Sequence, residues 1–369
     1  MPLPSDVQIC SVDDHVIEHP DAFKDRIPAR FRDRQPRIVE TTGQTVDPLG
    51  NVHEGTQQVW EIDGARYPTI GLNAVAGCPP EEYGLNPTRY DQMRPGCYDV
   101  HERIRDMNAN GVLGSINFPT FPHFCGQLFS KSKDLDLAIN VIRAYNDWHI
   151  DEWCGTYPDR LIPMSIMPLW DPELMAAEIR RTAAKGCHAV TFSENPEKLG
   201  FPGLHGDHWD PFWQACVDTG TVVCMHIGSS SSMTVTSLDA PADVSIAITP
   251  MNSYLALNDL MWTPVFRKFP QVVVALSEGG IGWIPYALER MDYTYEHHRA
   301  WTGADFGGLT PSDIFRRNVS TCFIDDATGI RIRDLVNLDM ITWECDYPHS
   351  DSNWPSSRQH LEKLLAAVP

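Results

Sequence analysis

The sequence predicts an α/β fold, a (β/α)8 TIM barrel, and three observations carry this prediction. The chain has 369 residues, a length that suits one large barrel with insertions better than a small domain. Short apolar runs alternate with longer helical patterns, and eight such runs occur along the chain. Apolar strands that alternate with amphipathic helices are typical of a parallel sheet covered by helices. We therefore expect a single barrel over residues 1–369.

The eight expected strands follow one another in the order that a barrel requires. They lie near residues 7–13 and at 112–119, 161–168, 187–192, 221–228, 271–280, 320–325 and 340–349. Helical patterns between these strands include 136–153, 172–186, 210–220, 253–270 and 283–298. No repeat of fixed period and no low-complexity linker interrupts the alternation, so one continuous domain is expected.

One segment, residues 35–97, breaks the alternation. It contains the stretches RIVETTGQTV and QQVWEIDGARYPTI, whose alternating pattern predicts hairpin strands, and a stretch rich in Pro and Gly follows them. Long loops after the carboxyl ends of barrel strands usually build the pocket. We interpret 35–97 as a β-hairpin and loop insertion after strand one that covers the barrel mouth.

Charge and composition argue against several classes of partner. The chain has 29 Lys and Arg against 49 Asp and Glu, a formal net charge of -20, which argues against nucleic acid or an anionic membrane. No apolar run is long enough to span a bilayer, and MPLPSDVQIC lacks a signal-peptide pattern. The ten cysteines form no CxxC pair, so we expect free thiols in a cytoplasmic protein.

Ionisable residues occur at the carboxyl ends of four expected strands: Asp13 and His15, His226, Glu278 and Asp346. Since positions two apart in a strand point the same way, Asp13 and His15 would face inward and Asp14 outward. Taken singly, such residues are more often hydrogen-bonded core groups or turn caps. Burying them together is costly unless they are paired or bind a cation. Two imidazoles and two or three carboxylates fit a divalent metal.

Four motifs together resemble the amidohydrolase superfamily: D-x-H after strand one, MHIG, SEGGIGWIP and DYPHSDSNWP. The resemblance spans about residues 9–355, and it points to the branch that includes aminocarboxymuconate-semialdehyde decarboxylase and the resorcylate-type decarboxylases. It implies a barrel with one metal ion, often zinc or manganese, held by Asp13, His15, His226 and Asp346. It also implies a homodimer or a higher homo-oligomer.

Two positions depart from the superfamily pattern. The usual H-x-H of strand one is Asp13-x-His15 here, so the donor set is richer in oxygen. Zinc remains the default expectation, and manganese is the alternative. The usual His of strand six is Glu278, which can accept a proton or bind a metal but cannot offer an imidazolium. This second departure favours hydrolysis over decarboxylation.

We therefore expect a metal-dependent hydrolase of a small organic molecule with an aromatic or acyl group. Metal-activated water would attack the substrate, with Asp346 as general base, Glu278 as assistant and His226 as ligand. The first alternative is non-oxidative decarboxylation of an aromatic or unsaturated carboxylic acid. The second is an inactive barrel that serves as a scaffold, against which the retention of His15, His226 and Asp346 argues.

Five further residues are candidates for contact with the small-molecule substrate: Glu194 after strand four, His205 and His208 on the next loop, Arg66 in the insertion, and His349. The ordinary interpretation of His205 and His208 is a solvated loop, and that of Arg66 is a surface arginine. His349 follows Asp346 by three residues and could instead support that ligand by a hydrogen bond.

Overall fold

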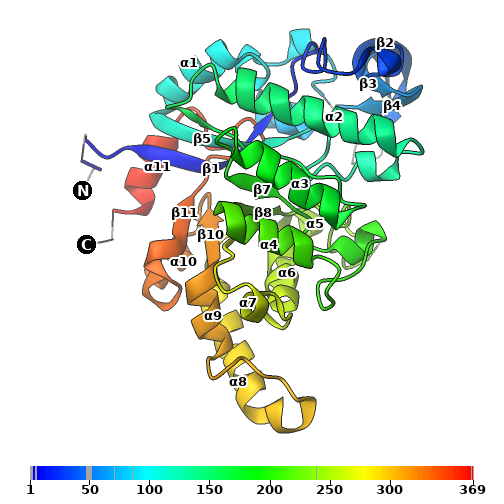
Figure 1. Cartoon of the computed structure of the whole chain (residues 1–369). Helices are drawn as coiled ribbons and strands as arrows, with labels where there is room; N and C mark the ends of the chain where they lie inside the picture. The colour runs from blue at the N-terminus through cyan, green and yellow to red at the C-terminus, as the bar shows by residue number, and fades with distance from the viewer. Residues whose placement is uncertain are drawn as a thin grey trace. The chain divides into compact units, whose positions relative to one another are not determined.

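The structure is a computed structural model and describes residues 3–4, 6–46, 52–69, 71–84, 86–237, 239–366 and 368 (Figure 1). Its internal contacts divide the chain into two compact units. The amino-terminal unit consists of Leu3–Pro168 and Cys345–Leu361. The carboxy-terminal unit consists mainly of Leu169–Glu344 and Glu362–Pro369. Each unit has its own parallel sheet and is described by itself.

Three parallel strands form the main sheet of the amino-terminal unit, in the order β1 (Ile9–Val16), β5 (Val112–Pro119) and β6 (Leu161–Ile162). Helices α1 (Val100–Asn110) and α2 (Leu135–Trp148) precede and follow β5. Each helix begins after an aspartate, Asp99 or Asp134, whose side chain accepts hydrogen bonds from the first free backbone N–H groups. A π-helical turn, η7 (His149–Cys154), continues α2.

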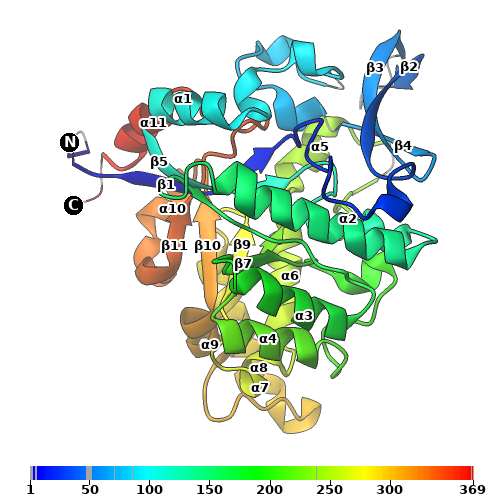
Figure 2. The same ribbon diagram turned by 45° about the horizontal axis from the view of Figure 1, so that its top comes forward.

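A second, antiparallel sheet in the amino-terminal unit comprises β2 (Arg37–Val46), β3 (Val52–Ile62) and β4 (Ala65–Pro68), visible as a long ribbon in Figure 2. The turn between β3 and β4 uses Asp63 and Gly64, both at positive φ. Residues 47–51, 70 and 85 of the expected insertion 35–97 lie outside the described residues. That this segment covers a barrel mouth stays a prediction.

Five parallel strands form the sheet of the carboxy-terminal unit, in the order β7 (Ala189–Thr191), β8 (Val222–His226), β9 (Val274–Ser277), β10 (Val319–Phe323) and β11 (Ile341–Trp343). The helices of this unit up to β9 are α3 (Pro172–Ala183), α4 (Asp210–Thr219), α5 (Ala242–Ile248), α6 (Met251–Met261) and α7 (Val265–Lys268). Then come α8 (Ile284–Thr302), α9 (Pro311–Asn318) and α10 (Ala327–Arg331). The last helix of the chain is α11 (Ser357–Leu364).

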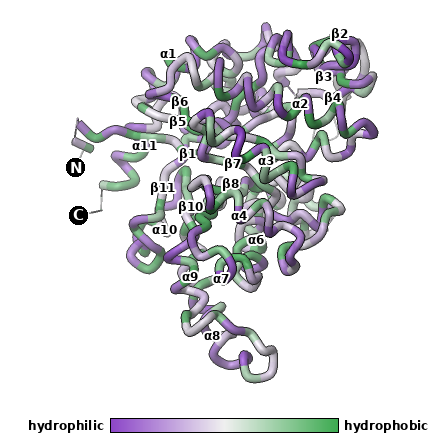
Figure 3. Tube along the Cα trace, viewed as in Figure 1, coloured by the Kyte–Doolittle hydropathy of each residue, from purple (hydrophilic) through white to green (hydrophobic). Residues whose placement is uncertain are grey.

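The core of the carboxy-terminal unit is aromatic where α4 packs beside β7. Phe192, at the end of β7, is fully buried and stacks on Phe212 with ring centroids 4.7 Å apart. Trp209 and Trp213 contact the same ring edge to face. In Figure 3 the trace around β8 and β10 is largely hydrophobic, as expected for strands covered on both faces.

All eight strands lie within or next to the expected intervals, and the prediction of an α/β protein with parallel strands is confirmed. The interval 161–168 yields only the two-residue β6, because Pro163 and Pro168 have no N–H to donate to a neighbouring strand. Among the described residues no closed barrel is detected, since the parallel strands form a three-stranded and a five-stranded sheet. Within the same residues, no helix has the length and apolar character needed to cross a bilayer.

The loop that follows β5 is anchored by a buried carboxyl group. Glu18 lies just after β1 and has no exposed surface. Its two oxygens accept the backbone N–H groups of Thr120 and Phe121, at 3.0 and 2.8 Å. Burial raises the pKa of Glu18 to about 7, although these hydrogen bonds oppose the shift.

Glu18 should make the stability of the protein depend on pH. Its carboxyl is protonated in the folded chain and ionised in the unfolded chain between its ordinary pKa of 4.5 and about 7. The stabilisation is therefore fully present below pH 4.5 and lost as the pH rises to about 7, a loss of up to about 3 kcal/mol.

The measurement is urea unfolding at pH 5 and pH 7.5. Glu18→Gln cannot titrate, so the decrease in its free energy of unfolding between the two pH values should be smaller than that of the wild type. Glu81→Gln, at an exposed position, should keep the wild-type decrease. An equal decrease in Glu18→Gln and the wild type would contradict the assignment.

Candidate functional site

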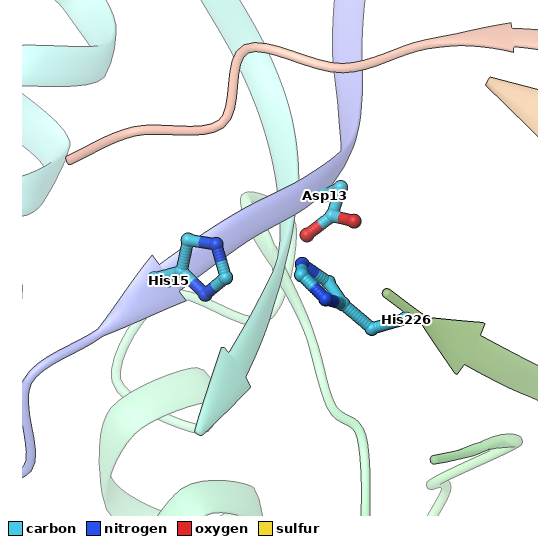
Figure 4. Close-up of side chains that lie close together, drawn as sticks. All are labelled: Asp13, His15 and His226. Carbon is cyan, nitrogen blue, oxygen red and sulfur yellow. The ribbon is translucent and has the colours of Figure 1, made fainter. Parts of the chain in front are cut away.

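Asp13 and His15 lie on β1 and are both 1% exposed. Figure 4 shows the two side chains leaving the strand, on which only Asp14 separates them in sequence. β1 pairs with β5 so that His15 lies opposite Phe118, and the ring of His15 also lies 5.8 Å from that of Phe124. The end of β1 therefore presents a carboxylate and an imidazole in an interior with little water.

Residues 345–347 run beside β1 and bring Asp346 next to His15. The backbone N–H of Asp346 donates to the carbonyl of Asp13 at 2.8 Å, and that of His15 donates to the carbonyl of Tyr347 at 2.7 Å. In this arrangement Oδ1 of Asp346 lies 2.9 Å from Nε2 of His15. Asp346 has φ 58°, a left-handed backbone conformation that costs free energy and recurs at active sites.

The second oxygen of Asp346 contacts another imidazole. Nδ1 of His349 lies 2.7 Å from Oδ2, which is the hydrogen bond given above as the alternative to its predicted contact with a substrate. Burial by itself would raise the pKa of Asp346. The charge of His349 and the hydrogen bonds from His15 and His349 outweigh burial and hold that pKa well below its usual range. Burial lowers the pKa of His15, against the pull of Asp346.

Asp14, which was predicted to face away from Asp13 and His15, is buried. The strand register shifts between Ser11 and Asp14, and this irregularity turns the carboxylate toward β5 and the 345–347 segment. It accepts hydrogen bonds from the hydroxyls of Ser11 and Ser115 and from the backbone N–H of Tyr347. Burial raises the pKa of Asp14 to about 6, while the charge of Arg103 and these hydrogen bonds lower it. Asp14 thus ties β1 to the segment that carries Asp346.

Arg103 is a second supporting residue, and the sequence analysis missed it. The side chain on α1 has no exposed surface and donates from Nε to the carbonyl of Gly96 at 2.7 Å and from Nη2 to that of His15 at 2.6 Å. Its guanidinium lies over the rings of Trp153 and Tyr347. A charged residue within a helical pattern is normally solvated, so the sequence carried no signal for this role.

In the carboxy-terminal unit, His226 ends β8 and Glu278 follows β9. His226, drawn in Figure 4, is 1% exposed, and its Nδ1 lies 2.5 Å from the carbonyl of Ile227. A proton on Nδ1 leaves the lone pair of Nε2 available as a metal ligand. Nε2 lies 3.5 Å from Oε2 of Glu278.

The backbone at Glu278 is held in a strained conformation. Its φ is 64°, and its N–H donates to Oε2 of the buried Glu344 at 3.1 Å. The next turn is anchored by Asp326, whose Oδ2 accepts the backbone N–H groups of Ile281 and Gly282 at 2.8 and 2.6 Å. The SEGGIG motif is therefore a turn built to fix one carboxylate beside His226.

Glu194 lies beyond β7 and is 4% exposed. Its Oε1 accepts the backbone N–H of Gly228 at 3.0 Å and the hydroxyl of Ser230 at 2.8 Å, with Nδ2 of Asn252 at 3.4 Å. Burial raises the pKa of Glu194, and these hydrogen bonds oppose the rise. Glu194 therefore fixes the loop that begins two residues after His226.

The other predicted substrate contacts lie at exposed positions. Nε2 of His205 lies within hydrogen-bond distance of Oδ1 of Asp259, at 2.7 Å, and the ring of His208 contacts that of Trp209 edge to face. Arg66 lies on β4 and pairs with Glu61 at 3.2 Å. The structure gives each a local partner and does not join the three into one site, so their contact with a substrate stays a prediction.

The donors present fit a divalent metal in chemistry and in spacing. Two atoms bound at about 2.1 Å to one ion, with angles of roughly 90–110°, lie about 3–3.4 Å apart. His15 Nε2 and Asp346 Oδ1 are 2.9 Å apart in one unit, just below this range, and His226 Nε2 and Glu278 Oε2 are 3.5 Å apart in the other, just above it. Imidazole and carboxylate donors suit zinc, and a higher share of oxygen favours manganese.

Known proteins resemble this chain in sequence and in fold. It is 23% identical over 269 residues to the 2-amino-3-carboxymuconate-6-semialdehyde decarboxylase of Dictyostelium discoideum, a match that covers 70% of this chain and 69% of that protein. A solved amidohydrolase from Mycobacterium avium subsp. paratuberculosis is 17% identical, with a TM-score of 0.69 over 98% of this chain and 94% of the other. At this identity the structural likeness establishes the fold alone.

A second solved structure is the 5-carboxyvanillate decarboxylase of Novosphingobium aromaticivorans with bound manganese and 3-methoxy-4-hydroxy-5-nitrobenzoic acid. It is 22% identical, with a TM-score of 0.59 over 72% of this chain and 76% of the other. Because the curated relative from Dictyostelium discoideum is named as a decarboxylase, the prediction of a hydrolase is wrong. The error came from the interpretation of Glu278, whose replacement of a histidine was taken to favour hydrolysis. A carboxyl group can also deliver a proton to carbon, so this replacement does not distinguish the two reactions.

The family itself is established by a match that covers most of the chain. The amidohydrolase family matches residues 56–369, a range that includes His226, Glu278 and Asp346. Asp13 and His15 precede the matched range and are joined to Asp346 through the hydrogen bonds of residues 345–347. The chain belongs to the amidohydrolase family.

Proposed function

We propose that this protein is a metal-dependent, non-oxidative decarboxylase of an aromatic or unsaturated carboxylic acid. The observation that carries the proposal is the buried Asp346 carboxylate between His15 and His349, on a strained backbone, in a chain with decarboxylase relatives. Such a group is costly to maintain in the interior unless it serves a ligand.

The proposal includes a closed (β/α)8 barrel, with residues 35–97 over its mouth. One observation supports the proposal: the eight parallel strands follow one another in chain order within their two sheets, as the strands of such a barrel do. In such a barrel the carboxyl ends of the strands meet at one face. Asp13, His15, His226 and Asp346 would then hold one divalent ion.

We favour manganese over zinc as that ion. The proposed ligands include two carboxylates, and the carboxyvanillate decarboxylase carries manganese. When bound, a divalent ion withdraws electron density from the carboxylate and neighbouring oxygen of an acid substrate. The residues of the chain must then orient the acid, exclude water and supply one proton.

Decarboxylation breaks the bond between carbon and the carboxylate, releases CO2 and leaves an electron pair on the carbon, which takes up a proton. Glu278 is the proposed donor, because its carboxylate is partly accessible and is fixed by a rigid turn. Asp346 suits the role of an anionic ligand, since its low pKa disfavours the protonated form. Glu194 and His349 are the proposed contacts to the substrate, and His205, His208 and Arg66 remain candidates.

Two substitutions separate the roles of ligand and acid. Glu278→Gln keeps the shape of the side chain but has no acidic proton, so it should retain manganese and lose about 10²–10⁴-fold in kcat. Asp346→Asn removes an anionic ligand, so it should lose both manganese and activity. Metal content by elemental analysis and CO2 release from a panel of hydroxybenzoic acids measure the two effects.

If Glu278→Gln lost manganese while Asp346→Asn kept it and lost only activity, Glu278 would be the ligand and Asp346 the acid. A manganese-loaded wild type that releases no CO2 from any aromatic or unsaturated acid would overturn the proposed function. If the purified protein bound no divalent metal even after reloading, the scaffold alternative would replace it. Glu81→Gln, at an exposed position, should match the wild type in both assays.

Asp14 should influence metal affinity without being a ligand. In Asp14→Asn the amide nitrogen cannot accept a hydrogen bond, so Ser11, Ser115 and Tyr347 lose part of their support. Residues that orient ligands typically contribute 10–100-fold to metal affinity. We expect the Kd for Mn²⁺, measured by calorimetry, to rise about 10-fold in Asp14→Asn and to stay unchanged in the exposed Asp33→Asn. Equal Kd values for the two variants would remove Asp14 from the site.

A further inference from the structure

The loop after β5 contains a histidine in a strained backbone conformation. His123 has φ 59°, and its N–H donates to the carbonyl of Thr120 at 3.1 Å. On one side the loop is held by both oxygens of Glu18. On the other side Oε1 of Gln127 accepts the backbone N–H of Cys125 at 2.8 Å. A left-handed conformation at a residue other than Gly persists only where the surroundings enforce it, and these bonds enforce it.

The same loop lies against the proposed ligand His15. β1 and β5 are in register with Val16 opposite Pro119, so the chain leaves β5 at the level of His15. The ring of Phe124, the residue after His123, has its centroid 5.8 Å from that of His15. His123 is therefore one residue from a direct contact with the site, within the same unit.

The imidazole of His123 is half-buried, and in the part of the chain that the structure describes no hydrogen bond to its ring is found. The ordinary explanation is a turn residue, because His tolerates positive φ better than most side chains. That explanation does not account for two facts. The residue is His although Gly would adopt this conformation without strain, and its ring is half-buried although a turn in solvent would leave it exposed. A ring kept there at a cost in free energy is better explained by a ligand.

We propose that His123 is a substrate-binding residue whose ring N–H donates a hydrogen bond to an anionic oxygen of the acid substrate. The inference rests on the proposed function and names one more contact in the same site.

The local electrostatics agree with this role. Burial lowers the pKa of His123, and the nearby positive charge of Lys131 lowers it further. A neutral imidazole keeps one N–H to donate at neutral pH. The charge of Lys131 that disfavours a cationic His123 also favours an anion at the same place.

The test separates the effect of the His123 ring on substrate binding from the effect of the strained backbone. His123→Gly removes the imidazole and relieves the positive φ, whereas His123→Asn tolerates the same φ and keeps a shorter donor. Asp25→Gly is the matched control, because Asp25 has φ 60° at an exposed position. Binding of 3-methoxy-4-hydroxy-5-nitrobenzoic acid to the manganese-loaded proteins is measured by calorimetry, together with manganese content and melting temperature.

We expect His123→Gly to raise the Kd for this acid by about 10–100-fold, as for the loss of a hydrogen bond to a charged group. Its manganese content should be unchanged, and its melting temperature equal to or above that of the wild type. His123→Asn should lose less affinity, and added imidazole should restore part of the affinity of His123→Gly. Asp25→Gly should bind the acid as the wild type does.

Two results would overturn the inference and leave the proposed function standing. One is a wild-type Kd in His123→Gly, and the other is loss of manganese from that variant, which would place His123 in support of the metal. If the wild type itself neither bound this acid nor released CO2 from any acid of the panel, the proposed function and the inference would fall together.

Discussion

The contact between Asp346 and His15 depends on a short run of backbone hydrogen bonds. Residues 345–347 donate to and accept from β1 between Asp13 and His15, and this pairing delivers a carboxylate to an imidazole in a buried environment. A buried carboxylate without partners would be protonated or would destabilise the fold. Here the imidazoles of His349 and His15 stabilise the ionised carboxylate of Asp346 and keep its pKa low.

The residues around that contact hold it in place from three directions. Asp14 bonds the N–H of Tyr347, Arg103 bonds the carbonyl of His15, and His349 bonds the far oxygen of Asp346. Such groups orient metal ligands and contribute to affinity as strongly as some ligands do. In the carboxy-terminal unit Glu344 and Asp326 perform a similar task for the turn that carries Glu278.

Backbone strain coincides with these positions. Asp346, Glu278 and His123 each follow a β-strand or the segment that continues one, and each has a positive φ although none is Gly. Strained conformations persist where the surroundings impose them, and they concentrate where a side chain must be aimed. The prediction of hydrolysis took Glu278 as a group that assists metal-bound water, and the proposed decarboxylation takes the same carboxyl as a proton donor. A carboxyl serves either reaction, so its presence alone decided neither.

The sequence by itself determined the α/β class, the eight strand intervals and the candidate ligands Asp13, His15, His226 and Asp346. It did so because apolar periodicity and chain order are local properties that survive without coordinates. The tertiary structure decided which polar groups meet: Asp14 accepts the backbone N–H of Tyr347, Arg103 donates to the carbonyl of His15, and His123 has a positive φ. These outcomes depend on contacts between segments far apart in the chain, such as residue 14 with residue 347, and no local pattern encodes such contacts.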